Sequence, residues 1–137
     1  MSVSVLLITH ARLGNDLLGT VTEVMGAPPL ATEVMAVRRV LDTDALVRQG
    51  KRLLDRLDRG NGVLILTDAF GSTPSNIANR IAKGRRARVV AGVNLPMLVS
   101  VYNYPALDLE AQAENAVKSG REGIVLCKDG DGTFDHA

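Results

Sequence analysis

The chain has 137 residues, of which 46% are hydrophobic, so it is long enough for one globular domain with a buried core. Sixteen basic and fifteen acidic residues leave a formal charge of +1, which gives no overall field for binding nucleic acid or anionic lipid. The single cysteine, Cys127, excludes an internal disulfide, and without a signal peptide or a long apolar run we expect a cytoplasmic protein with no direct membrane insertion.

The first stretch predicts a buried strand followed directly by a histidine. Residues 2–8 form a short, β-branched-rich apolar run. The apolar period that follows is helical, with Asn15 as a suitable N-cap and an end near Gly26. We therefore expect His10 just beyond the carboxyl end of a strand, in the turn that opens a helix.

Two further segments repeat this alternation of strand and helix. Residues 32–37 read as a second strand, and residues 42–44 supply cap candidates for a helix that ends at Gly60. Residues 63–67 are apolar without alternation. A parallel strand covered by helices on both faces has this pattern.

The third strand leads into a loop with polar and glycine residues. Asp68 follows the strand, the loop turns at Gly71, and Thr73 can cap a helix whose first position suits Pro74. The remaining expected elements are a strand at 87–93, a short helix at 96–101, a helix from Asp108 to Gly120 and a last short strand at 122–127. This order predicts an α/β protein: a single doubly wound domain over residues 1–128, with a mostly parallel sheet, helices on both faces and a loose tail at 129–137.

The loops after the first and third strands carry residues suited to phosphate chemistry. If these strands are adjacent, His10 and Asp68 meet where the strand order reverses, which is where such sheets bind ligands. A carboxylate that accepts the Nδ1 proton leaves Nε2 with a free lone pair. Gly71, Ser72 and Thr73 offer amide and hydroxyl groups at a helix N-terminus, which can hold phosphate. The set favours phosphoryl transfer through a phosphohistidine, with no cofactor and no metal ion.

Other readings of these residues are open or less well supported. An isolated histidine at a strand end can simply contact a loop carbonyl, and Asp68 can simply cap its loop. The chain has no G-x-S-x-G elbow, no phosphate-binding loop of nucleotide triphosphatases and no G-x-G-x-x-G turn. A receiver domain would need companion acidic residues at the end of the first strand, where Thr9 and His10 stand.

Four motifs in order resemble one known family. They are Thr9-His10, the run from Asp68 to Asn76, the run from Ala91 to Leu98 and the run from Ser119 to Gly123. Over roughly residues 3–127 the chain resembles the IIA component of the mannose-type (mannose/fructose/sorbose) sugar phosphotransferase system.

The resemblance implies roles for individual residues. His10 would accept phosphate from the histidine phosphocarrier protein, and Asp68 would hydrogen-bond and orient the active imidazole. Thr73 matches a hydroxyl residue before the proline, and Phe70 matches an aromatic position. Ser72 departs from the pattern, since the best-known sugar-transporting members have a second glycine there.

The resemblance also implies partners. Phosphate would pass to a IIB component, or the phosphorylated state would serve regulation. A IIB domain is not expected after residue 137, so both a transport and a regulatory relay are open. The alternatives are the phosphoryl-donor subunit of a dihydroxyacetone kinase and a non-enzymatic sensor of phosphorylation state. The family further implies a homodimer that exchanges an antiparallel edge strand at residues 124–127, against a plain intramolecular edge strand.

Overall fold

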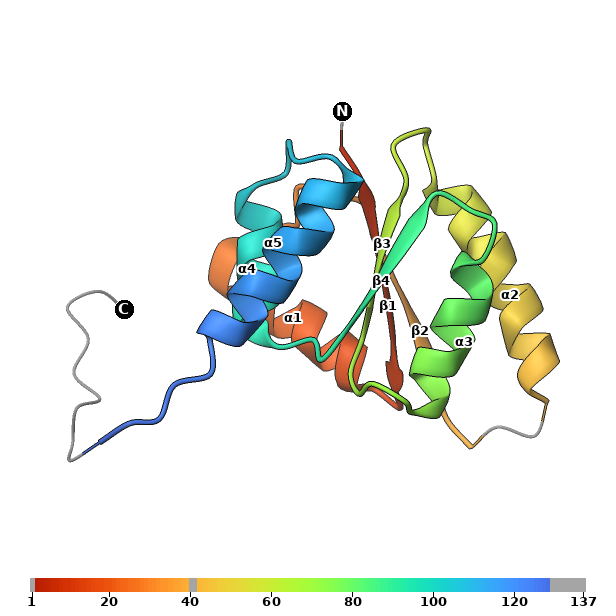
Figure 1. Cartoon of the computed structure of the whole chain (residues 1–137), viewed down its shortest axis with the longest axis horizontal. Coiled ribbons are helices and arrows are strands. Elements are labelled where there is room, and N and C mark those ends of the chain that lie inside the picture. Colours follow the sequence, from red (N-terminus) through yellow and green to blue (C-terminus); the bar gives the residue numbers. More distant parts are fainter. Residues whose placement is uncertain (1, 40–41, 129–137) are drawn as a thin grey trace.

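Four parallel strands and five helices form one α/β domain in the computed structural model, which describes residues 2–39 and 42–128 (Figure 1). The expected tail at 129–137 lies outside the described residues. The strands are β1 (Ser4–His10), β2 (Thr32–Val37), β3 (Val63–Thr67) and β4 (Ala87–Ala91). The helices are α1 (Leu13–Met25), α2 (Thr43–Leu57), α3 (Thr73–Ala82), α4 (Leu95–Asn103) and α5 (Leu109–Glu122).

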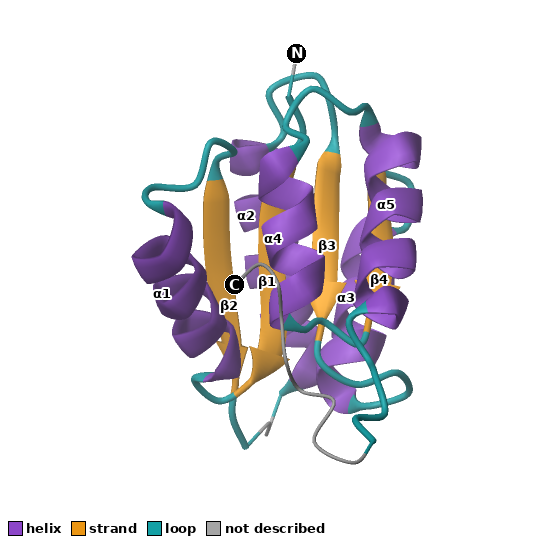
Figure 2. Ribbon diagram, turned by 90° about the vertical axis from the view of Figure 1, so that its left-hand side faces the viewer, coloured by secondary structure: helices purple, strands orange, loops and turns teal. Residues whose placement is uncertain are grey.

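The sheet has the order β2-β1-β3-β4, and every neighbouring pair is parallel. Helices α2 and α3 cover one face, while α1, α4 and α5 cover the other (Figures 1 and 2). The predicted doubly wound α/β architecture is confirmed. The strand order reverses between β1 and β3, as the placement of the site requires.

Alternate residues of β1 belong to two separate cores. Val5 and Leu7 pack in the core beneath α1, α4 and α5, and Leu6 and Ile8 pack in the core beneath α2 and α3. All four are 0% exposed. A strand buried on both faces needs apolar residues at every position, which accounts for the uninterrupted apolar run.

The boundaries of several elements differ from the sequence predictions. β1 extends to His10, so the histidine is the last residue of the strand. α1 begins at Leu13, ahead of the expected cap Asn15, and Ser72 rather than Thr73 is the N-cap of α3. The predicted caps Asp42 and Asp108 are confirmed, because their side chains accept hydrogen bonds from the amides of Ala45 and Ala111.

The predicted C-terminal strand is absent from the described part of the chain. α5 continues to Glu122, and residues 124–128 form no strand and extend away from the domain (Figure 1). The amide of Gly123 bonds to the carbonyl of Ser119 at 3.0 Å, so the helical winding carries past the expected strand start. Ile124, Val125 and Leu126 are 77%, 71% and 80% exposed. The predicted strand at residues 122–127 is therefore not formed in the single chain, and the alternative of an edge strand within one chain is wrong.

None of the helices in residues 2–39 and 42–128 has both the length and the apolar character that crossing a membrane requires.

The close packing of α2 on α3 gives a stability prediction. A Cβ atom added to Gly50 would overlap the Cδ1 atom of the fully buried Ile81 and lie 2.8 Å from its Cγ1. Gly50→Ala should therefore lower the free energy of unfolding by about 1–3 kcal/mol, the usual cost of overpacking. Urea unfolding measures this change.

Gly19, in α1, is the matched control. A Cβ there meets nothing within 4 Å. Gly19→Ala should raise the free energy of unfolding by up to about 1 kcal/mol, because alanine is the better helix former. Equal effects of the two substitutions would contradict the packing argument.

Candidate functional site

His10 and Asp68 lie together at the carboxyl edge of the sheet. The last pair in the register joins Ile8 of β1 to Thr67 of β3. His10 and Asp68 follow this pair within two residues. This is the point where the strand order reverses, and neighbouring parallel strands lie only about 4.8 Å apart. The sequence prediction that the two loops meet here is confirmed.

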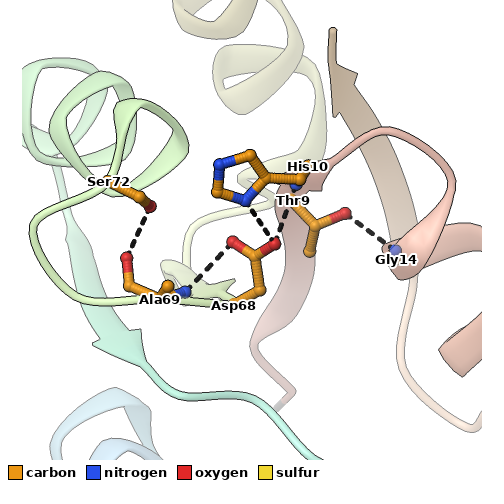
Figure 3. Close-up of polar contacts among 6 residues, drawn as sticks. All are labelled: Thr9, His10, Gly14, Asp68, Ala69 and Ser72. Atoms are coloured by element: carbon orange, nitrogen blue, oxygen red, sulfur yellow. Dashed lines mark hydrogen bonds and ion pairs between the residues drawn. The ribbon is translucent and has the colours of Figure 1, made fainter.

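The Asp68 carboxylate accepts hydrogen bonds from both the backbone and the ring of His10 (Figure 3). Its Oδ2 atom lies 2.9 Å from the His10 amide nitrogen and 2.7 Å from Nδ1. Its Oδ1 atom accepts a hydrogen bond from the amide of Ala69 at 3.0 Å. The carboxylate is thus held from two sides, and it fixes the direction in which the imidazole points.

This geometry determines which ring nitrogen is available. Burial raises the pKa of the Asp68 carboxyl, but the hydrogen bonds that it accepts from the His10 amide and ring outweigh this effect, and the pKa lies below its ordinary value. An ionised carboxylate only accepts hydrogen bonds, so Nδ1 carries the proton. The neutral ring then has its lone pair on Nε2. The His10 side chain is 55% exposed and that of Asp68 only 9%, so the ring is the accessible partner of the pair.

The β3–α3 turn lies next to the ring. The Ser72 hydroxyl donates to the carbonyl of Ala69 at 2.5 Å and closes the turn (Figure 3). Gly71 has φ of +81°, a conformation that glycine adopts without strain. Among the described residues, the amides of Gly71 and Thr73 donate no hydrogen bond. The turn therefore offers free donors at the N-terminus of α3, while the Ser72 hydroxyl is already engaged.

Two polar residues that support the site were missed by sequence reasoning. Thr9 is fully buried, and its hydroxyl accepts a hydrogen bond from the amide of Gly14 at 2.7 Å, which ties the start of α1 to the end of β1. The carbonyl of Thr67 accepts hydrogen bonds from the amides of Gly92 and Val93, each at 2.9 Å. For Thr9, a polar residue that ends an apolar run was the available signal, but its partner comes from the fold. Thr67 acts through its backbone carbonyl, and its buried hydroxyl has no hydrogen-bond partner among the described residues.

Side chains around the imidazole are open to solvent. Phe70 is 89% exposed, and Arg12 is exposed at the beginning of α1. Ala11, between His10 and Arg12, has φ of +44°, an unusual conformation for a non-glycine residue. This residue turns the chain sharply after the strand, so the backbone leaves the imidazole uncovered.

A comparison with family models identifies the family of the chain. The model described as "EIIA-man: PTS system fructose IIA component" matches residues 4–118. The chain belongs to the mannose-type IIA family of the sugar phosphotransferase system. The resemblance found from the sequence motifs is thereby confirmed.

Curated relatives of this IIA chain carry further sequence. The chain is 31% identical over 133 residues to the "PTS system mannose-specific EIIAB component" of Escherichia coli K12 and to its counterpart from Shigella flexneri. Each match covers 93% of this chain and 40% of the relative. The chain thus spans less than half the length of the curated relatives that it matches.

Solved structures share the fold of this IIA chain. A mannose/sorbose-specific IIA subunit from Enterococcus faecalis superposes with a TM-score of 0.82 at 22% identity, over 93% of this chain and 96% of that one. A phosphotransferase component EIIA from Streptococcus agalactiae superposes with a TM-score of 0.78 at 18% identity, over 90% and 95% of the two chains. At these identities the likeness concerns the fold alone.

The lowered pKa of Asp68 predicts how the His10–Asp68 contact responds to acid. A carboxyl whose pKa is lowered on folding stabilises the fold fully at pH values above its ordinary pKa of 3.8. This contribution disappears as the pH falls through the folded-state pKa. The difference in unfolding free energy between wild type and Asp68→Asn should shrink as the pH falls from about 5 to about 2.5. Urea titrations at a series of pH values measure it. A difference that grows toward acid would contradict the assignment.

Proposed function

We propose that this chain is a phosphocarrier of a phosphoenolpyruvate-dependent phosphotransferase system, with phosphate carried on His10. One observation carries the proposal: the Nδ1 atom of an accessible imidazole lies 2.7 Å from a mostly buried carboxylate, which leaves Nε2 free. Membership of the mannose-type IIA family supports it. The donor is the histidine phosphocarrier protein, and the acceptor is a IIB component or a regulatory partner.

The transfer step forms one bond and breaks another. The lone pair of His10 Nε2 attacks the phosphorus of the donor's phosphohistidine as the donor's N–P bond breaks, and that electron pair returns to the donor imidazole. The His10 ring gains positive charge while Nδ1 keeps its proton. Asp68, an ionised hydrogen-bond acceptor, stabilises this charge.

The β3–α3 turn is the proposed binding site of the phosphoryl oxygens. The amides of Gly71 and Thr73 are free donors at the N-terminus of α3, where the helix dipole favours an anion. The Thr73 hydroxyl is a further donor. The Ser72 hydroxyl reaches the phosphate only after releasing the carbonyl of Ala69, so we assign it the smaller contribution.

The chemistry of the bond gives the central test. Incubation with phosphoenolpyruvate, the first enzyme of the relay and its histidine phosphocarrier protein should label wild type and leave His10→Ala unlabelled. The label should survive base and be lost in mild acid, because the N–P bond of a phosphoramidate hydrolyses when it is protonated. Mass spectrometry of the labelled peptide locates it.

Asp68→Asn separates orientation from simple loop capping. Its labelling rate should fall by about two to four orders of magnitude if the carboxylate sets the tautomer and stabilises the ring charge. A rate equal to that of wild type would contradict the pairing. Onward transfer to a IIB protein would identify a sugar relay, whereas transfer to a dihydroxyacetone-binding subunit would identify the kinase alternative.

We further propose that two copies of the chain form a homodimer through residues 124–127. β4 is an edge strand of the sheet, and a groove of about 640 Å³ lined by Val89, Val90 and Val117 lies between it and α5. Ile124 and Leu126 are exposed in the single chain, at positions that share one side of an extended strand. Exchange between two copies would bury these side chains and cover the open edge.

Charge introduced into this segment tests the dimer. Wild type should sediment at about twice the monomer mass of 14.6 kDa at micromolar concentration, and Ile124→Asp/Leu126→Asp should sediment as a monomer. Because both residues are exposed in the single chain, far-ultraviolet circular dichroism of the variant should remain that of the folded domain. A variant that stays dimeric would contradict the exchange.

A further inference from the structure

Two basic segments lie at the end of the sheet opposite His10. One is the carboxyl end of α2 with part of the loop that follows it, residues 51–60, and the other is the loop between α3 and β4, residues 83–86. Together they contain seven basic and two acidic residues. Figure 1 shows the loops before β3 and β4 at one end of the sheet and the end of β1 at the other.

Direct contacts hold the two segments against each other. Nε of Arg85 donates a hydrogen bond to Oδ1 of Asp55 in α2 at 3.0 Å. Nη1 of Arg86 donates to the carbonyl of Gly60. A Cβ atom added to Gly62 would lie 2.8 Å from Cγ of Arg86, so the two loops pack closely. The basic charges of both segments therefore belong to one surface.

Most of this basic charge is not neutralised. Asp55 is paired with Arg85, and Asp58 accepts hydrogen bonds from the amides of Gly60 and Gly62 at 2.8 and 3.0 Å. Five exposed side chains of the two segments form no ion pair within residues 2–39 and 42–128. We name these five the amino-edge basic surface: Arg52, Arg56, Arg59, Lys83 and Arg86.

Stabilisation of helix ends accounts for only part of this surface. The carboxyl end of a helix carries a partial negative charge, which nearby cations stabilise. Arg56 lies in the last turn of α2, and Lys83 is the C-cap residue of α3. Arg52 lies before that last turn, whereas Arg59 and Arg86 lie beyond the helices. These three arginines have no such role.

Charge is distributed unevenly over the molecule. The two basic segments have a surplus of five positive charges, and the whole chain has a formal charge of only +1, so the rest of the chain is net acidic. On the other face of the sheet, α1 contains Asp16 and Glu23 and no basic residue. A molecule with this asymmetry turns its basic side toward a negatively charged surface.

The composition of the amino-edge basic surface favours a lipid bilayer over a protein or a nucleic acid. Among the described residues, the large apolar side chains that are exposed lie outside α2, α3 and the loops at 58–62 and 83–86. Protein interfaces depend on aromatic and apolar anchors, and single-stranded nucleic acids stack on aromatic side chains. Both helices pack on the sheet through one core, so neither projects as a helix that enters a DNA groove. An anionic bilayer requires only clustered basic side chains, each of which strengthens binding about fivefold.

We propose that the amino-edge basic surface binds the surface of an anionic phospholipid bilayer, through charge and without insertion. This inference does not depend on the proposed phosphocarrier function. The five-residue strand β3 is about 17 Å long, so His10 and Asp68, at the opposite end of the sheet, stay clear of the lipid. The bound protein keeps its phosphate site open to solvent.

Co-sedimentation with lipid vesicles tests the proposal. Wild type should bind vesicles of phosphatidylcholine that contain about one third phosphatidylglycerol, and it should not bind vesicles of phosphatidylcholine alone. Binding at about 0.1 M NaCl should be lost at about 1 M, where the screening length falls to about 3 Å. Equal binding to both kinds of vesicle, or binding to neither, would overturn the proposal.

Charge substitutions locate the binding surface. Arg52→Glu/Arg59→Glu should lower the partition coefficient for the anionic vesicles at least about tenfold. Arg52→Gln/Arg59→Gln should lower it less, because neutral side chains remove attraction without adding repulsion. Both arginines are exposed, so circular dichroism of each variant should remain that of wild type. A glutamate variant that binds as tightly as wild type would overturn the assignment.

Arg12→Glu/Arg38→Glu is the matched control, with the same change of net charge at the opposite end of the sheet. Arg12 is the N-cap residue of α1, and Arg38 follows β2; both are exposed. This variant should bind the anionic vesicles as wild type does. An equal decrease in the two glutamate variants would mean that net charge alone acts, and would overturn a local surface.

Duplex DNA of random sequence distinguishes a bilayer from any polyanion. Wild type should leave the mobility of the duplex unchanged at the salt and protein concentrations at which it binds the vesicles. Tighter binding to the duplex than to the vesicles would overturn the bilayer as the partner of this surface.

Discussion

The parallel pairing of β1 with β3 is the constraint on which the site depends. Both strands are buried on both faces, so neither can shift by one residue without moving apolar side chains out of one core and into the other. The fixed register sets the ends of the two strands side by side, and His10 and Asp68 are the residues found there. The hydrogen bond between them thus follows from the packing of the apolar side chains of β1 and β3 in the two cores.

Those parts of the structure that depend on local pattern could be predicted from the sequence. Continuous apolar runs gave the strands of a covered parallel sheet, and Asp42 and Asp108 gave two helix starts. The contact of His10 with Asp68 needed one further assumption, that their strands are neighbours. Residues whose partners come from elsewhere in the fold were not predictable in this way. The hydroxyl of Thr9, which lies outside α1, accepts a hydrogen bond from the amide of Gly14. The helix begins at Leu13, ahead of the expected cap at Asn15.

The end of the domain was mispredicted for a different physical reason. The run from Ile124 to Leu126 has the composition of a strand, but composition does not supply the edge with which a strand must pair. Within one chain the segment stays exposed because α5 continues to Glu122 and directs it away from the sheet. Ser72 illustrates the same limit at the site, since its hydroxyl bonds to Ala69 in the turn, a choice that sequence spacing does not reveal.

A single carboxylate oxygen, Oδ2 of Asp68, receives hydrogen bonds from both the backbone and the ring of His10. The ring is therefore fixed relative to its own main chain, and both side-chain torsions are restricted although the side chain is largely open to solvent. Ordering a side chain of this size costs on the order of 1 kcal/mol in conformational entropy. In this protein that loss occurs during folding, so the imidazole is already held in one orientation before any partner binds.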